Sequence, residues 1–339
     1  MPFSQGVLFR PAKGVNIRMQ VILYHNHRLR YADGAPAMLE PVDSAVTIGS
    51  FDGVHCGHRK IISSMLETAR RHSFRSVVVT FDPHPRLVLN ADAGDRIEVL
   101  TTLDEKIEQI AGLGVDLLIV VRFTPELAGW SSGKFIEELL AGTLSAKSVT
   151  VGYDHGFGKG RSGSGATLAG LGERLGFSVQ VVEELRIDSE HISSTRIRSL
   201  LKNGQIREAN SFLGAPYVIS GAVVEGRKLG RELGFPTVNL KLFDPAKLLP
   251  RRGVYMATTQ IEGETYRAMM NIGTRPTLCL QDAGVIVEAH ISGFSGSLYG
   301  NELRFSLHGF IRDEKKFDSL EALREQLEKD KKTMELFFE

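Results

Sequence analysis

The sequence predicts an α/β domain followed by a β domain. From about residue 45 to residue 182, short runs rich in β-branched residues alternate with longer segments of helical periodicity. Such alternation is typical of a mostly parallel, doubly wound sheet. Beyond residue 217, short strands follow one another with glycines between them, a spacing that indicates an antiparallel barrel or sandwich. A charged helical tail, expected over residues 318–336, would pack one face on this second domain.

The elements of the first half follow from this periodicity. Its strands are expected at residues 45–48, 76–81, 117–122, 148–151 and 178–182. Its helices are expected at residues 59–72, 102–113, 131–140 and 165–175. Sheets of this type bind ligands at the carboxyl ends of their strands, so the turns after the first and second strands are candidate binding segments.

The second half begins after a helical linker. Helices are expected at 194–203 and 206–213, and Gly214 and Pro216 form a helix stop. Strands are then expected at residues 217–224, 254–260, 264–272, 285–292 and 302–310. We therefore predict domains at 19–213 and 214–339. Residues 1–18 are basic and contain no acid, and we expect a frayed or mis-annotated extension there rather than a transit peptide.

Composition narrows the class of protein. A length of 339 residues suits about two domains. The formal net charge of +1 provides no strong field for nucleic acid or an anionic membrane. Two cysteines, Cys56 and Cys279, provide no disulfide framework and suit a reducing cytoplasm, where we expect the protein. No apolar run approaches the ~20 residues that span a bilayer.

The segment TIGSFDGVHCGH, residues 47–58, is the most informative motif. A buried strand runs into a glycine-rich turn, and His55 and His58 open a helix. Histidines three apart lie on one face, beside unpaired N–H groups that favour anions. This arrangement suits a polyphosphate whose charge changes during reaction, where catalysis works by positioning and electrostatics. Gly49 and Gly53 permit close backbone approach. The structural alternative is a pair of surface histidines.

Three other segments of the first half are polar, and each also has an ordinary structural explanation. The glycine-rich loop 151–163 can wrap an adenosine, with Asp154 accepting from ribose or base, or it is a long surface loop. The hydroxyls of segment 192–198 can cap a helix, which leaves its arginines on the surface. Prolines make TFDPHPR, residues 80–86, rigid enough for a pocket wall.

The second half carries its own phosphate-type cluster at residues 226–239, GRKLGRELGFPTVN. Basic residues among glycines suit a phosphate-binding loop, although the pattern is not a Walker A motif. Thr237 and Asn239 offer hard oxygen ligands that suit Mg²⁺. On a later strand, Glu288 and His290 share a face, and a carboxylate there can take a proton from a substrate hydroxyl. A surface hairpin and a surface glutamate are the alternatives.

With both clusters in place, the chain closely resembles the bacterial bifunctional riboflavin kinase/FAD synthetase family over about residues 19–333. The resemblance is carried in order by TIGSFDGVHCGH, TFDPHPR, VGYDHGFGKGRSG, ISSTRIR, GRELGFPTVN, NIGTRPT, VEAHISGF, SLYGNEL and IRDEKKFDSLEALREQLEKD. It implies a nucleotidyltransferase-like (Rossmann-like) first domain and a riboflavin-kinase-type barrel with a C-terminal helix. It also implies two reactions that use ATP and Mg²⁺. The barrel would phosphorylate riboflavin to FMN, and the first domain would transfer AMP to FMN, giving FAD and pyrophosphate.

The resemblance also implies roles for individual residues. The expected catalytic residues are His55, His58 and Glu288. The residues expected to bind ATP and phosphate in the adenylyltransferase are Gly49, Phe51, Gly53, Asp154, Ser194, Thr195 and Arg198. The residues expected to bind flavin are Asp82, Pro83, His84 and Arg312. The residues expected to bind ATP and phosphate in the kinase are Gly226, Lys228, Gly230, Gly234, Thr237 and Asn239, and Thr237 and Asn239 are also the expected Mg²⁺ ligands. The expected partners are ATP, riboflavin and FMN, with no nucleic acid and no membrane, in a monomeric or weakly self-associating protein.

Several positions depart from the family pattern. Ser50 stands where asparagine is common, Gly156 where an arginine is usual, and Gly293 and Ser297 replace more acidic residues. These changes motivate one alternative, a chain with a single active domain. A flavin-binding module without catalysis is a second alternative, and the retained histidines and Glu288 argue against it. A general adenylyltransferase fits the first half only.

Overall fold

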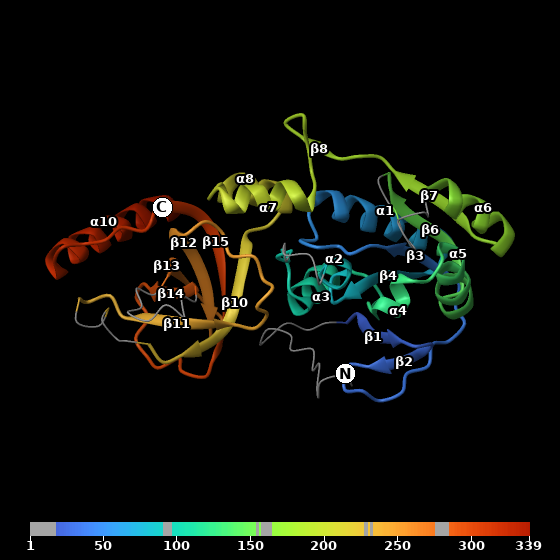
Figure 1. Ribbon diagram of the computed structural model, residues 1–339, viewed down its shortest axis with the longest axis horizontal. Helices are drawn as coiled ribbons and strands as arrows, with labels where there is room; N and C mark the ends of the chain where they lie inside the picture. Colours follow the sequence, from blue (N-terminus) through green and yellow to red (C-terminus); the bar gives the residue numbers. More distant parts are fainter. Residues whose placement is uncertain are drawn as a thin grey trace. The chain divides into compact units, whose positions relative to one another are not determined.

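The computed structural model describes residues 18–90, 97–153, 156, 165–226, 230, 233–274 and 285–339. The chain forms two compact units, Met1–Ser194 and Thr195–Glu339 (Figure 1). The activity domains predicted at 19–213 and 214–339 stay a prediction, and all of the expected extension but Arg18 lies outside the described residues. No helix in the described part of the chain is long and apolar enough to cross a membrane.

The first unit is built on a seven-stranded sheet with the order β2-β1-β5-β4-β3-β6-β7. Every neighbouring pair is parallel except β1 and β2, which confirms the predicted doubly wound architecture. The strands are β1 (Gln20–His25), β2 (Arg28–Tyr31), β3 (Ser44–Ile48), β4 (Arg75–Asp82), β5 (Leu117–Arg122), β6 (Ala146–Gly152) and β7 (Ser178–Val182). A small separate hairpin follows, β8 (Arg186–Ile187) and β9 (Glu190–His191).

Helices cover both faces of this sheet. They are α1 (Cys56–His72), α2 (Pro85–Leu89), α3 (Leu103–Ala111), α4 (Pro125–Ala128), α5 (Ser132–Phe135), the π-helix η1 (Ile136–Thr143) and α6 (Gly165–Leu175). Alternate residues of β5 belong to two different cores. Ile119 packs with the α5, η1 and α6 side chains, whereas Leu118 packs with those of α1 and α3. This division explains why the strands read as continuous apolar runs. The helix expected at 131–140 is α-helical only up to Phe135 and continues as η1.

The second unit contains a closed six-stranded antiparallel barrel with the order β10-β11-β14-β13-β12-β15. The barrel, rather than the sandwich, is therefore correct. The strands are β10 (Tyr217–Val224), β11 (Thr237–Leu242), β12 (Gly253–Ile261), β13 (Glu264–Thr274), β14 (Val285–Ile291) and β15 (Glu302–Arg312). Strand β11 was not predicted, because the glycines and charges before it indicated a loop.

Three helices belong with the barrel: α7 (Ser194–Lys202), α8 (Ile206–Leu213) and α10 (Leu320–Phe338). Helix α10 packs one face on the barrel, as expected. Its fully buried Met334 lies in a cluster with Met256 and Met269 of β12 and β13, and Leu327 packs against the same cluster. Leu320 is 48% exposed, so the contact is made by the later turns of the helix.

Candidate functional site

The histidine motif lies at the carboxyl end of β3, in the middle of the parallel sheet. His55 is the N-cap of α1, and its Nδ1 accepts a hydrogen bond from the backbone N–H of His58 at 3.3 Å. The two imidazole rings stack, with centroids 3.5 Å apart and planes inclined by 17°. The predicted pair is therefore one compact unit at a helix N-terminus, where the backbone N–H groups attract anions.

The turn before these histidines is strained and closely packed. Phe51 and Val54 have φ of +45° and +37°, a region that bulky side chains seldom occupy. The carboxylate of Asp52, 1% exposed, accepts hydrogen bonds from the backbone N–H groups of Leu100 and Thr101 at 2.9 and 3.1 Å. These bonds hold the strained turn in one conformation.

The glycines of this turn let the chain pass close to an aromatic ring. A Cβ at Gly49 would lie 3.1 Å from the ring of Phe51, and Gly53 has φ +87°. The Phe51 side chain is 2% exposed and belongs to the hydrophobic core. Its predicted part in ATP binding therefore rests on its backbone.

Burial and nearby positive charge both favour the neutral imidazole of His58. Burial holds the pKa of His58 well below its usual range, and the nearby His55 and Lys106 lower the pKa further. Its Nδ1 is buried without a hydrogen-bond partner in the described part of the protein. A neutral ring with one uncommitted nitrogen suits hydrogen bonding to a ligand.

Lys106 of α3 was missed by the sequence analysis. It is only 4% exposed, and its Nζ lies 3.4 Å from Oγ1 of Thr80 near the end of β4. The available signal was its place four residues before the buried Ile110, on the apolar face of the helix. A lysine on such a face is buried unless its head group reaches water.

The residues predicted to bind flavin lie at the end of β4 and directly after it. Asp82 and Pro83 are joined by a cis peptide bond, and His84 caps α2 by accepting from the backbone N–H of Arg86 at 3.2 Å. Because β3 and β4 pair in parallel, the segment lies at the same carboxyl end of the sheet as the histidines. Flavin binding by these residues stays a prediction.

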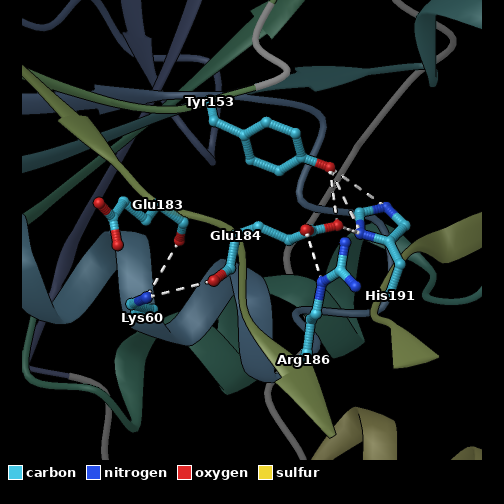
Figure 2. A network of polar contacts seen from close by, with 6 residues as sticks. All are labelled: Lys60, Tyr153, Glu183, Glu184, Arg186 and His191. Carbon is cyan, nitrogen blue, oxygen red and sulfur yellow. Dashed lines mark hydrogen bonds and ion pairs between the residues drawn. The ribbon is translucent and has the colours of Figure 1, made fainter. Parts of the chain in front are cut away.

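The predicted adenosine loop begins where β6 ends, and Asp154 lies outside the described residues. Before it, the Tyr153 hydroxyl contacts the carboxylate of Glu184 at 3.3 Å and the ring of His191 (Figure 2). Glu184 also pairs with His191 and, at 2.9 Å, with Arg186. From α1, Lys60 donates to the carbonyl of Glu183 at 3.0 Å (Figure 2). This network joins the end of β6, the β8–β9 hairpin and α1.

Ser194 contacts the histidine turn directly. Its Oγ donates to the carbonyl of Asp52 at 2.9 Å. The hydroxyl predicted to contact phosphate therefore binds the backbone of the turn in this state. Thr195 and Arg198 follow on helix α7, and their predicted roles are not tested by this contact.

In the second unit, a row of polar side chains crosses three adjacent strands. Glu288 of β14 pairs in register with Asn239 of β11 on one side and with Asn271 of β13 on the other. Val287 and Ala289, the neighbours of Glu288 in sequence, are buried, so Glu288 faces away from the barrel interior. The sequence predicted Glu288 and Asn239 as site residues but not Asn271.

The next row along the same face contains Thr237 and His290, which pair in register. His290 Nδ1 lies 2.9 Å from the carbonyl of Pro236. Thr237 is exposed and Asn239 is 9% exposed. Thr237 and Asn239 thus share one face of β11, as predicted, and the proposed base Glu288 is directly opposite Asn239.

The glycines of the basic loop permit close contacts. A Cβ at Gly226 would lie 2.0 Å from the side-chain nitrogen of Asn239, and one at Gly230 would lie 2.2 Å from the carbonyl of Phe235. Gly234 has φ +82°. Lys228 lies outside the described residues. Only glycine at Gly226 lets the loop backbone lie against Asn239.

Arg312 has structural partners. Its guanidinium binds both carboxylate oxygens of Asp330 in α10, at 2.7–3.0 Å, and donates to the carbonyl of Asp313 at 3.0 Å. Asp330 is 1% exposed and also accepts from Gln326 at 2.9 Å. This pair anchors α10 to the barrel, and the predicted flavin contact stays a prediction. The divergent Gly293 and Ser297 are both exposed.

Comparison with known proteins identifies both units. A family model described as FAD synthetase matches residues 38–196, and one described as riboflavin kinase matches residues 213–338. Bifunctional riboflavin kinase/FMN adenylyltransferases from Listeria monocytogenes and Bacillus subtilis are each 36% identical, over 88% of this chain and 93% and 94% of the relatives. The Escherichia coli K12 relative is 37% identical over 86% of this chain and 92% of its own length.

A solved structure is similar over almost the whole chain. It is described as a macrolide-efflux protein from Streptococcus pneumoniae, with a TM-score of 0.83 and 29% identity over 94% of this chain and 99% of that one. Its description concerns that protein, whereas the two family models and the curated relatives agree with one another. The chain belongs to the family of bifunctional riboflavin kinase/FMN adenylyltransferases.

Proposed function

We propose that this protein makes FAD from riboflavin in two ATP-dependent steps. The barrel unit phosphorylates riboflavin to FMN, and the N-terminal unit transfers AMP from a second ATP to FMN and releases pyrophosphate. The observation that carries the proposal is that each unit has its own polar site. One site is the stacked pair of His55 and His58, and the other is Glu288 between two amide side chains.

In the adenylyl-transfer site, the chain acts by position and charge. The ATP phosphates bind at the N-terminus of α1, where backbone N–H groups and the imidazoles of His55 and His58 donate hydrogen bonds. These donors stabilise the charge that grows on the departing pyrophosphate, and no covalent nucleophile is required. The further residues proposed for this site are Gly49, Phe51, Gly53, Asp154, Ser194, Thr195 and Arg198, with Asp82, Pro83 and His84 for the flavin.

In the kinase site, Glu288 accepts the proton from the terminal hydroxyl of riboflavin as that oxygen attacks the γ-phosphate of ATP. The backbone at Gly226 lies against Asn239, and we place the start of the phosphate loop there. The further residues proposed here are Lys228, Gly230, Gly234, Thr237, Asn239 and Arg312.

Thr237 and Asn239 fit the Mg²⁺ that we propose for the kinase. Their side-chain oxygens share one face of β11 beside Glu288, and Mg²⁺ commonly uses one or two protein oxygens together with substrate phosphates. No group of three His, Cys, Asp or Glu that could hold a metal occurs among the described residues. Bound Mg²⁺ would neutralise phosphate charge. We further propose a cytoplasmic protein that binds small molecules but no nucleic acid, as a monomer or weak oligomer.

A timed incubation of the purified full chain with riboflavin, ATP and Mg²⁺, followed by separation of the flavins, tests the proposal. We expect FMN to appear first and FAD to follow. FMN without FAD would place the defect in the N-terminal unit. FAD from added FMN, without any product from riboflavin, would mean an inactive barrel. The absence of both products would overturn the proposal.

A further inference from the structure

Lys106 is a buried cation beside the histidine pair, and the mechanism above does not use it. Helix α3 begins with a capping box in which Thr102 and Glu105 bond to one another's backbone N–H groups, and this cap fixes the first turn that carries Lys106. The Lys106 side chain is 4% exposed. Of the groups that the structure describes, only Thr80 Oγ1, at 3.4 Å, lies within hydrogen-bonding distance of its Nζ.

Two carboxylates near Lys106 oppose the effect of its burial. Burial lowers the pKa of Lys106, while the carboxylates of Asp52 and Asp82 raise it. Thr80 Oγ1 itself donates to the carbonyl of Ser50 at 3.1 Å, so it can accept from the ammonium. An ammonium group has three N–H donors. A buried charged group is tolerated where an opposite charge nearby compensates it.

We propose that Lys106 is an electrostatic positioning residue of the adenylyl-transfer site, whose buried ammonium, held at Thr80 beside the histidine turn, attracts the phosphates bound there. The inference rests on the proposed adenylyl transfer. It assigns a part in that reaction to Lys106, which lies on α3 and outside the histidine motif of residues 47–58.

The electrostatic argument follows from the charges that face the histidines. A positive charge nearby disfavours a second one, and Lys106 and His55 both lower the pKa of His58. We therefore assign the site's positive charge to Lys106 rather than to His58. In a site with little water, such a fixed charge acts strongly on an incoming polyphosphate.

The test compares the wild-type full chain with Lys106→Met, which removes the charge but keeps an apolar side chain of similar length. Ring resonances of His58, assigned with His58→Gln, are titrated in the ligand-free protein. We expect the pKa of His58 to rise in Lys106→Met. We also expect kcat/KM for FAD formation from FMN to fall about 10²-fold, with its acid limb moved to higher pH. Lys247→Met is the matched control, since Lys247 is equally buried, at 4% exposure, in the barrel. It should change neither the His58 titration nor FAD formation.

The outcomes separate this inference from the proposed function. The pKa of His58 could rise in Lys106→Met while the wild-type chain itself makes no FAD. That result would support the position of the Lys106 charge and overturn the proposed adenylyl transfer. An unchanged His58 titration, with FAD formation intact, would overturn the role of Lys106. If Lys106→Met does not fold, Lys106→Gln replaces it. Titration of the Lys106 side-chain resonances in the wild-type protein is independent of both variants. A neutral amine at about pH 7 there would overturn the inference.

Discussion

The imidazole of His55 lies almost flat on that of His58, with ring centroids 3.5 Å apart, while its Nδ1 accepts the backbone N–H of His58. An imidazole nitrogen that accepts carries no proton, so neutral His55 has its proton on Nε2. The N-cap bond therefore selects the tautomer of His55 and presents an N–H donor. Two stacked rings also disfavour double protonation of the pair.

Replacement of His58 should disable one activity only. We expect His58→Ala to slow FAD formation from FMN by about 10²–10³ in kcat, because one donor to the developing charge is lost. FMN formation from riboflavin, measured in the same preparation, serves as the control. Equal loss of both activities in a folded variant would contradict the assignment of the two reactions to separate sites.

Glu288 should show the reverse behaviour. In Glu288→Gln the side chain keeps its size and its place between Asn239 and Asn271 but cannot accept the substrate proton. General-base catalysis typically contributes 10²–10⁴-fold, and we expect FMN formation to fall by about that factor. Conversion of FMN to FAD should stay within about twofold of the wild type. Undiminished riboflavin phosphorylation would rule out Glu288 as the base.

Gly226→Ala tests the close approach of the phosphate loop to Asn239. The new Cβ would lie 2.0 Å from the Asn239 side chain, so either the loop or the proposed metal ligand must move. We expect KM for ATP in the kinase reaction to rise and kcat to fall, with FAD formation from FMN unchanged. Gly170→Ala is the control, because a Cβ there meets no atom within 4 Å. Kinase constants equal to those of the control would contradict the predicted contact.

The lowered pKa of His58 predicts a pH effect on stability. The group binds a proton more readily in the unfolded chain, whose pKa is near 6.5, so protonation favours unfolding. The contribution of His58 is therefore constant well above pH 6.5, and the free energy of unfolding falls as the pH drops below that value. We expect His58→Gln to flatten this dependence in urea titrations between about pH 7.5 and 5.5. Curves of equal slope for wild type and variant would contradict the burial of a neutral His58.

Asp330 should contribute much more to stability than a surface acid in the same unit. Asp330→Ala leaves the guanidinium of Arg312 without its carboxylate partner, and loss of one member of a buried pair costs about 3–5 kcal/mol. Asp313→Ala is the control, because Asp313 and Arg251 form an exposed pair, which is worth about 1 kcal/mol or less. Chemical unfolding of the barrel unit measures both. Equal effects would mean that Asp330 does not anchor α10.

The local sequence pattern predicted most of the helices and strands but missed some of the strands. The helix at Gly165–Leu175 and the strand at Tyr217–Val224 occur with the expected bounds, because apolar periodicity and glycine stops act within a few residues. The short strand Arg28–Tyr31 was missed because it is polar and lies at a sheet edge. Strand β11 was missed because the glycines and charges before it indicated a loop, and because one of its two neighbours, β14, comes much later in the chain.

By itself, the sequence determined the two architectures, the place of the histidine turn and the oxygen-bearing pair Thr237 and Asn239. Only the tertiary structure decided which side chains stand beside them. Asn271 lies next to Glu288 through strand register, and Lys106 acts on His58 because α3 packs on the same sheet face as α1. Periodicity is a property of neighbouring residues, whereas register and the field of a buried charge depend on segments brought together by folding.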